Sequence, residues 1–164
     1  MLVVKVVGIG GQGVVYLSWL LGYAAMLRGY YTSVHNSYGA EVRGGTVTSN
    51  IVISEDKEYN PYTLKTDILL ILHNFGWKIL NQVRPDVIIA DDEVAYVKKA
   101  PQNVIWRPFS RLANERKLNM NMIALGYLIR HINMINLKDL IEAIKRRGGD
   151  VEKNIKAVKI GYSL

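Results

Sequence analysis

A glycine-rich turn close to the start of the chain holds the first residues whose types and spacing suggest chemistry. It reads Val7-Gly8-Ile9-Gly10-Gly11-Gln12-Gly13-Val14 and lies between a β-branched run at residues 2–7 and an apolar run at residues 14–27. The first run predicts a buried strand and the second a buried helix. Glycines let backbone N–H groups approach an anion, and the start of a helix adds positive dipole. The turn therefore predicts a phosphate-binding loop.

The residues around the turn limit which kind of phosphate loop it is. Val14 and Val15 stand where a P-loop carries its lysine and its serine or threonine, so ATP hydrolysis is not expected. Three of the glycines fit the dinucleotide pattern, but that pattern needs an acid where residues 33–36 read Ser-Val-His-Asn. A standard NAD site is therefore not expected either. The alternative use of the glycines is tight packing of the strand against the helix.

A second stretch whose residue types suggest ligand binding is Ser37-Tyr38-Gly39-Ala40-Glu41-Val42-Arg43-Gly44-Gly45. A glycine pair beside an arginine lets the backbone come close to a ligand while the guanidinium donates two hydrogen bonds to a carboxylate or phosphate. The alternative is an internal Glu41–Arg43 salt bridge that stiffens a turn. Spacing alone does not separate these two interpretations.

The remaining polar groups predict no catalytic residue and no metal site. The carboxylates at residues 91–93 (Asp-Asp-Glu) could hold magnesium, but we expect one to cap a helix and the others to be solvated. The three histidines are scattered, so each is expected to be structural. The chain has no cysteine, which excludes disulfides, thiolate catalysis, cysteine-ligated iron–sulfur clusters and cysteine-based zinc sites on this chain.

Positive charge is concentrated in the second part of the chain, which has a net charge of +7. Residues 1–90 contain seven Lys/Arg and six Asp/Glu, whereas residues 91–164 contain fourteen and eight. This excess can face a polyanion, an acidic partner subunit or a phosphorylated cofactor; for Lys145-Arg146-Arg147 we expect a solvated helix surface instead. No nucleic acid is expected, because the chain has no RNA-binding aromatic motif, zinc finger or basic heptad helix.

No membrane contact is expected either. The longest apolar stretch, at residues 14–27, is too short to span a bilayer. The N-terminal apolar run is short, lacks a basic region and breaks at Gly8, so no secretory signal is predicted. We therefore expect a cytoplasmic protein.

The elements that must position these motifs alternate between strand and helix. Strands are predicted at residues 2–7, 30–36, 46–54, 66–73, 86–90 and 103–109. Helices are predicted at residues 14–27, 76–82, 112–117 and 119–133, then from Leu137 to a stop at Gly148 and from Val151 to a stop at Gly161. Gly126 inside a helix predicts a close backbone contact. The pattern predicts one domain over residues 1–164: an α/β, Rossmann-like, doubly wound and mostly parallel sheet with a helical C-terminal cluster.

Together, the two glycine motifs resemble the gamma subunit of 2-oxoacid:ferredoxin oxidoreductases, the pyruvate/2-oxoglutarate ferredoxin oxidoreductase gamma family. The resemblance begins at residues 8–13 (Gly-Ile-Gly-Gly-Gln-Gly) and continues about 25 residues later at residues 37–45. Residues 119–126 look like the family's Asn-x-x-x-Leu-Gly-type helix, and residues 151–162 look like its closing helix. Ala40 stands where many relatives have proline, which affects no predicted chemistry.

The resemblance implies a subunit of a hetero-oligomeric enzyme that is not catalytic alone. Such complexes oxidatively decarboxylate a 2-oxoacid on thiamine diphosphate, pass electrons through [4Fe–4S] clusters to ferredoxin, and release an acyl-CoA. This chain has no cysteine and no Gly-Asp-Gly motif followed by an Asn-Asn pair. It therefore agrees with thiamine diphosphate, its magnesium ion and the clusters lying on partner subunits.

In relatives, this domain is associated with coenzyme A. By that analogy, the residues expected near the coenzyme's phosphates are Gly8, Gly10, Gly11, Gln12 and Gly13. The residues expected to line the cleft, or to contact the catalytic subunits, are Ser37, Tyr38, Glu41, Arg43, Gly44 and Gly45. The form of the second motif ranks 2-oxoglutarate first as the substrate and pyruvate next. The alternative is a stand-alone nucleotide-binding or regulatory module without redox partners.

Overall fold

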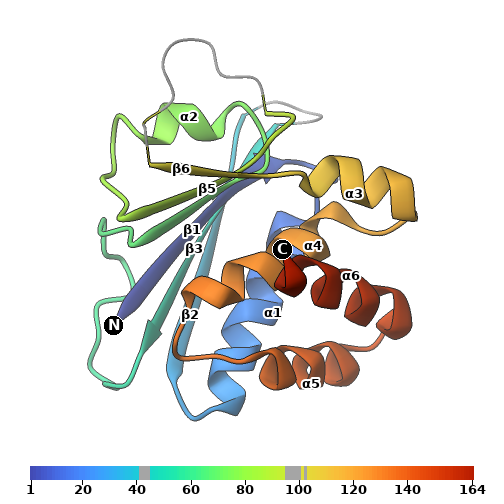
Figure 1. The fold of residues 1–164 in the computed structure, drawn as a ribbon. Coiled ribbons are helices and arrows are strands. Elements are labelled where there is room, and N and C mark those ends of the chain that lie inside the picture. The colour runs from blue at the N-terminus through green and yellow to red at the C-terminus, as the bar shows by residue number, and fades with distance from the viewer. Residues whose placement is uncertain (41–44, 95–100, 102) are drawn as a thin grey trace.

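In the part of the chain that the structure describes, six strands and two helices occupy the first two thirds, and four further α-helices follow β6 (Figure 1). The computed structural model describes residues 1–40, 45–94, 101 and 103–164. The strands are β1 (Leu2–Ile9), β2 (Tyr31–Tyr38), β3 (Thr46–Ser54), β4 (Ile68–Ile71), β5 (Val87–Asp91) and β6 (Val104–Arg107). The helices are α1 (Val14–Leu27), α2 (Gly76–Ile79), α3 (Phe109–Arg116), α4 (Met120–Leu128), the 3-10 turn η1 (Ile129–His131), α5 (Leu137–Arg147) and α6 (Val151–Ser163).

The strands form one sheet in the order β2-β3-β1-β4-β5-β6. β1, β4, β5 and β6 are mutually parallel, while β3 runs antiparallel to both β1 and β2. Only residues 39–45 join β2 to β3, and a parallel crossover needs a dozen residues or more. The short connection therefore reverses the chain. The mostly parallel sheet is confirmed, with β3 as its reversed strand.

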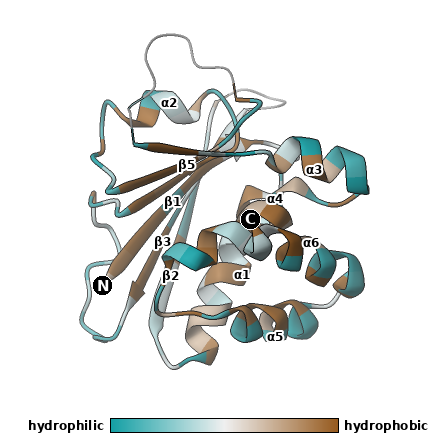
Figure 2. Ribbon diagram, viewed as in Figure 1, coloured by the Kyte–Doolittle hydropathy of each residue, from teal (hydrophilic) through white to brown (hydrophobic). Residues whose placement is uncertain are grey.

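Apolar side chains cover both faces of the sheet. On one face, residues of β1, β3 and β4 pack with those of α1, α4, α5 and α6 in the larger core. On the other face, Trp77, Ile79 and Leu80 pack on a smaller cluster of strand residues. Figure 2 shows hydrophobic colour along β1, β3 and β5, whereas the edge strand β2 is paler and more hydrophilic. The two covered faces confirm the doubly wound α/β fold.

Two glycines allow the helices α4 and α6 of the C-terminal cluster to pack closely against each other. A Cβ on Gly126 of α4 would lie 2.1 Å from the Val158 carbonyl oxygen, and a Cβ on Gly161 would lie 1.8 Å from that of Ile123. The predicted close contact at Gly126 is therefore confirmed, with α6 as the partner. The predicted stop at Gly161 is wrong, because α6 continues to Ser163 and uses this glycine for packing against α4.

Several predicted boundaries also differ from the observed ones. Phe109 does not end β6; it is the first residue of α3 and is fully buried, and Pro108 suits a helix start because its φ is fixed. The helix predicted over residues 119–133 becomes α4 followed by the 3-10 turn. α2 is shorter than predicted, and β2 extends beyond residue 36 to Tyr38. No helix in the described part of the chain is long and apolar enough to cross a membrane.

Candidate functional site

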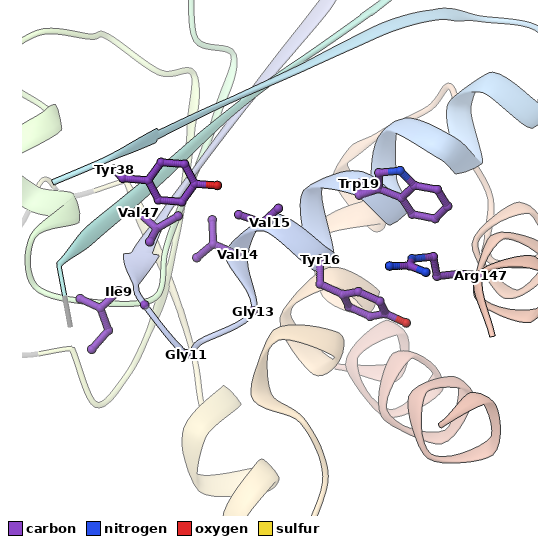
Figure 3. Close-up of a pocket in the computed structure, with 11 residues that line it drawn as sticks. Ile9, Gly11, Gly13, Val14, Val15, Tyr16, Trp19, Tyr38, Val47 and Arg147 are labelled. Carbon is purple, nitrogen blue, oxygen red and sulfur yellow. The ribbon is translucent and has the colours of Figure 1, made fainter. Parts of the chain in front are cut away.

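The glycine turn lies at the carboxyl end of β1 and directly precedes α1 (Figure 3). β1 neighbours β4 in the sheet, and the chain leaves β1 toward the larger core but leaves β4 toward the α2 side. This is a topological switch point, where open α/β sheets bind ligands beyond the carboxyl ends of their strands. The predicted phosphate-loop geometry of strand, turn and helix is therefore present.

The Gln12 side chain stabilises the turn through two hydrogen bonds. The Ile9 N–H donates to Gln12 Oε1 (2.9 Å), and Gln12 Nε2 donates to the backbone carbonyl of Leu72 beyond β4 (3.0 Å). A Cβ on Gly8 would lie 2.7 Å from the same Oε1, so only glycine leaves room for this arrangement. The Gln12 amide thus builds the loop, and only the backbone at this position is free to meet a ligand.

Gly13 joins the turn to α1 and to α4. As the N-cap of α1 it has a φ of +71°, and its carbonyl accepts a hydrogen bond from Asn121 Nδ2 (3.2 Å). α1 has no acidic residue in its first turn, and no described side chain caps it. Its first N–H groups have no intrahelical partner and carry the positive end of the helix dipole. This end of α1 can therefore accept an anion.

The second motif meets the glycine turn at two points. The Gly10 N–H donates to the Gly45 carbonyl (3.0 Å), and Tyr38 lines a cavity beside the turn. Ser37 is exposed, and strand alternation directs it to the opposite face of β2 from Tyr38. Glu41, Arg43 and Gly44 lie outside the described residues, so the choice between a ligand contact and an internal salt bridge stays a prediction.

Three cavities surround the glycine turn. The first, about 510 Å³, lies between Tyr38 and α1 and is lined mostly by apolar side chains (Figure 3). The second, about 470 Å³, lies on the side of α3 and α4 and includes Asn114, Asn119 and Asn121. The third, about 220 Å³, lies at the ends of β4 and β5. Each of the two larger cavities beside the turn therefore has the volume of a typical small-ligand site.

Among the residues of the first cavity that were not predicted from the sequence as site residues are Tyr16, Trp19 and Arg147. The Arg147 guanidinium lies 5.2 Å from the Trp19 ring centroid and 5.9 Å from that of Tyr16. The prediction of a solvated surface at residues 145–147 is thus wrong for Arg147, although Arg146 does pair with Glu142 on the exposed face (2.7 Å). The available signal was the spacing of Tyr16 and Trp19, one helical turn apart on α1.

A chain of polar contacts fixes Tyr16. Asn119 Nδ2 donates to Asn154 Oδ1 (3.1 Å), and Asn154 Nδ2 donates to the Tyr16 hydroxyl (3.3 Å). These contacts link α6 and the start of α4 to the first turn of α1. The ring that faces Arg147 is therefore held by the C-terminal helices.

The carboxylates after β5 serve the structure. Asp91 is buried and accepts hydrogen bonds from the backbone N–H (3.2 Å) and the hydroxyl of Ser110 in the first turn of α3, as a helix cap does. Asp92 pairs with Arg111 (2.9 Å), and Glu93 is exposed. Among the described residues, no group of three His, Asp or Glu side chains is arranged to hold a metal ion. Asp91 therefore binds the first turn of α3 from the end of β5, whereas the N-cap residue of that helix is Pro108 and not a carboxylate.

The histidines pack against aromatic rings. His35 lies against Tyr62, His73 against Phe75 and His131 against Tyr127, with ring centroids 4.8, 4.8 and 5.2 Å apart. Burial lowers the pKa of His131 below its ordinary 6.5, and the positive charges of Arg130 and Arg107 lower it further. The neutral ring is therefore favoured in the fold, as expected for a structural histidine.

Comparison with known proteins gives consistent matches over the whole chain. Residues 3–164 match the family model described as pyruvate ferredoxin/flavodoxin oxidoreductase. The 2-oxoglutarate synthase subunit KorC of Methanocaldococcus jannaschii is 32% identical over 172 residues, covering 98% of this chain and 92% of the relative. The 2-oxoglutarate synthase subunit KorC of Archaeoglobus fulgidus is 30% identical, covering 98% of this chain and 86% of the relative.

Solved structures share the fold. The pyruvate oxidoreductase subunit PORC from Thermotoga maritima superposes with a TM-score of 0.82 at 20% identity, covering 99% of this chain and 95% of that one. A 2-oxoglutarate:ferredoxin oxidoreductase from Magnetococcus marinus superposes with a TM-score of 0.85 at 22% identity, covering 99% of this chain and 30% of that one. That structure was solved with 2-oxoglutarate, coenzyme A and succinyl-CoA bound. At these identities, the likeness is one of fold.

Proposed function

This chain belongs to the pyruvate ferredoxin/flavodoxin oxidoreductase family, and we propose that it serves as the gamma subunit of a complex that oxidises 2-oxoglutarate. The complex belongs to the 2-oxoacid:ferredoxin oxidoreductases, which convert a 2-oxoacid to an acyl-CoA. Support for 2-oxoglutarate comes from the KorC relatives, which are named for that substrate and align along nearly the whole chain. Pyruvate is the second choice.

Within that complex, the role we assign to this chain is to hold the phosphates of coenzyme A. One observation carries the assignment: the uncapped start of α1, reached through a glycine turn at the switch point of the sheet, opens between two cavities of about 510 and 470 Å³. Backbone N–H groups and the helix dipole there favour a diphosphate. The backbone of the turn would bind the coenzyme, while Gln12 and Asn121 keep the turn in shape.

The composition of this chain supports placing the iron–sulfur clusters of such a complex on other subunits. It has no cysteine to ligate an iron–sulfur cluster, and its described residues contain no arrangement of His, Asp or Glu for a metal ion. We therefore assign thiamine diphosphate, magnesium and the [4Fe–4S] clusters to partner subunits, with ferredoxin as the electron acceptor. The chain contributes coenzyme binding and assembly, and is not catalytic by itself.

The test is to tag this chain in its native host, purify it without oxygen, and record what accompanies it. We expect larger subunits, a brown iron–sulfur spectrum, and ferredoxin reduction that requires both coenzyme A and a 2-oxoacid. Assays of 2-oxoglutarate, pyruvate and indolepyruvate on one sample then identify the substrate. A colourless, solitary protein that binds a nucleotide would instead support the stand-alone module.

A further inference from the structure

The outer edge of strand β2 carries backbone groups that have no partner among the described residues. β2 forms one edge of the sheet and β6 forms the other (Figure 1). The Gly39 N–H donates to the Thr46 carbonyl (2.7 Å), so alternate residues from 31 to 37 bond to β3 and the residues between them face outward. The outward N–H and C=O groups are those of Thr32, Val34, Asn36 and Tyr38. A row of unpaired groups of this kind is a template for a further strand.

β2 lacks the features that usually protect the edge of a sheet. Protected edge strands are short, charged or flanked by proline. β6 fits that description, because it has four residues, ends at Arg107 and lies between Pro101 and Pro108. β2 has eight residues, no charged side chain and no proline, and Tyr31 and Tyr38 at its two ends are 44% and 66% exposed. This contrast indicates that another strand covers β2 in the assembled protein.

The residue types of β2 favour a second copy of the same strand as the occupant. Two identical edge strands pair antiparallel about a twofold axis, with outward groups facing outward groups. Two registers then pair most of the strand, namely residues 31–37 with Val34 on the axis, or residues 32–38 with His35 on the axis. In the first register, Ser33 lies opposite His35 of the second copy at two equivalent places. In the second register, His35 lies opposite itself and Ser33 lies opposite Ser37.

The first register pairs two polar groups that lack partners within one chain. Ser33 Oγ and His35 Nε2 are buried atoms, and neither has a hydrogen-bond partner among the described residues. Val34 packs toward the larger core, so strand alternation puts both side chains on the opposite face. Opposite residues of paired strands have Cβ atoms about 4.5–5.5 Å apart, which lets the hydroxyl donate to the neutral imidazole. Both residues are half-buried, so a change of rotamer turns these atoms toward the edge.

We propose that β2 pairs antiparallel with β2 of a second copy of this chain, with Val34 on the twofold axis. The hydroxyl of Ser33 donates to His35 of the second copy, and Thr32 lies opposite Asn36 of the second copy on the α1 side. Because β2 carries no charge, two copies do not repel each other along this edge. The pairing is independent of the coenzyme role proposed above, and it would join two complexes through one continuous sheet.

The first experiment measures the dissociation constant of the dimer of the purified chain by analytical ultracentrifugation. Ser33→Lys removes the hydroxyl at both equivalent contacts and should raise Kd by about 100-fold, at about tenfold for each lost hydrogen bond. Ser163→Lys is the matched control at an exposed position of α6 and should leave Kd unchanged. Ser33→Lys/His35→Glu sets opposite charges face to face and should recover about tenfold of the loss. Circular dichroism of each variant checks that the fold is kept.

The second experiment tests the register by cross-linking. The chain has no cysteine, so only introduced thiols react. Ser33→Cys chains mixed with His35→Cys chains place two thiols opposite each other, with Cα atoms about 4.5 Å apart, and a mild thiol oxidant should link them into a disulfide-bonded dimer. Ser33→Cys mixed with Ser37→Cys is the control, because these positions are opposite each other only with His35 on the axis. That mixture should give little dimer.

Three outcomes overturn the proposal. The first is a purified chain that is monomeric at every concentration tested; if Ser33→Lys then reduces the other subunits that co-purify, β2 binds a strand of a partner subunit instead. The second is a dimer whose Kd is the same for Ser33→Lys and Ser163→Lys, which forms through another surface. The third is cross-linking of the control mixture in preference to the test mixture, which places His35 on the axis and leaves Ser33 without its partner.

Discussion

Substitution of Gly13 by alanine tests the joint between the glycine turn, α1 and α4. The new Cβ would lie 2.3 Å from Asn121 Nδ2, and the residue has a φ of +71°, which an L-amino acid rarely adopts. Two costs therefore add: backbone strain and displacement of the amide that donates to the Gly13 carbonyl. Gly29 has a φ of +89°, and a Cβ added there would meet nothing within 4 Å, so Gly29→Ala isolates the strain.

The magnitudes follow from these two contributions. A left-handed alanine costs about 1–2 kcal/mol, and this should be the whole effect of Gly29→Ala. Loss of a partner for a buried polar group costs about 1–3 kcal/mol more, so Gly13→Ala should lower the free energy of unfolding by about 2–5 kcal/mol. The double variant Gly13→Ala/Asn121→Ala removes the clash, and its loss should be smaller than the sum of the single losses by about 1–3 kcal/mol.

The assay is urea unfolding of each purified chain, followed by far-ultraviolet circular dichroism, with the free energy taken from midpoint and slope. A Gly13→Ala chain no less stable than the Gly29→Ala chain would refute the role of Asn121. Strict additivity in the double variant would do the same. In either case, the turn would be held by β1 and β4 alone.

Single contacts elsewhere in the chain lead to three further predictions. Gln12→Glu keeps the acceptor for the Ile9 N–H but cannot donate to the Leu72 carbonyl, so the free energy of unfolding should fall by about 1 kcal/mol. The added negative charge should raise KM for coenzyme A more than tenfold. Equal KM values for the variant and the wild type would exclude a phosphate near this residue. Gly161→Ala should destabilise the chain by at least about 1–2 kcal/mol despite better helix propensity, because the new Cβ meets the Ile123 backbone. In the control Gly22→Ala, the new Cβ meets side-chain atoms of Val34 (2.9 Å) and Thr32 (3.8 Å) and no backbone, so this variant should cost less in the same urea titration. His131 has a folded-state pKa below 6.5, so the unfolded chain binds the proton more readily and stability should fall as the pH drops below about 6.5. A His131→Phe chain should lose this part of the pH dependence of its unfolding midpoint. A midpoint that depends on pH as in the wild type would contradict the lowered pKa.

Strands and the glycine turn could be predicted because their signals are local. Continuous aliphatic runs such as Ile68–Ile71 are typical of strands buried on both faces, and they form the centre of the sheet. The direction of β3 follows from the length of one connection, which the sequence contains but residue types do not indicate. The role of Gly161 could not be predicted from local propensity, because the partner that requires a glycine lies 38 residues earlier, at Ile123.

The aromatic cavity could not be predicted for a different reason. Residues 14–27 contain a single polar side chain, Ser18, so hydrophobic periodicity does not indicate which side of α1 is covered. The structure leaves Val15, Trp19 and Met26 exposed. Arg147 reaches Trp19 only because α5 packs alongside α1, a tertiary contact between distant parts of the chain.

A structure of the intact complex with coenzyme A bound would test the role of the glycine turn without any inference from kinetics. We expect the diphosphate of the coenzyme within hydrogen-bond distance of backbone N–H groups in residues 11–15. Coenzyme A held entirely by other subunits, with the glycine turn packed against protein, would contradict this role.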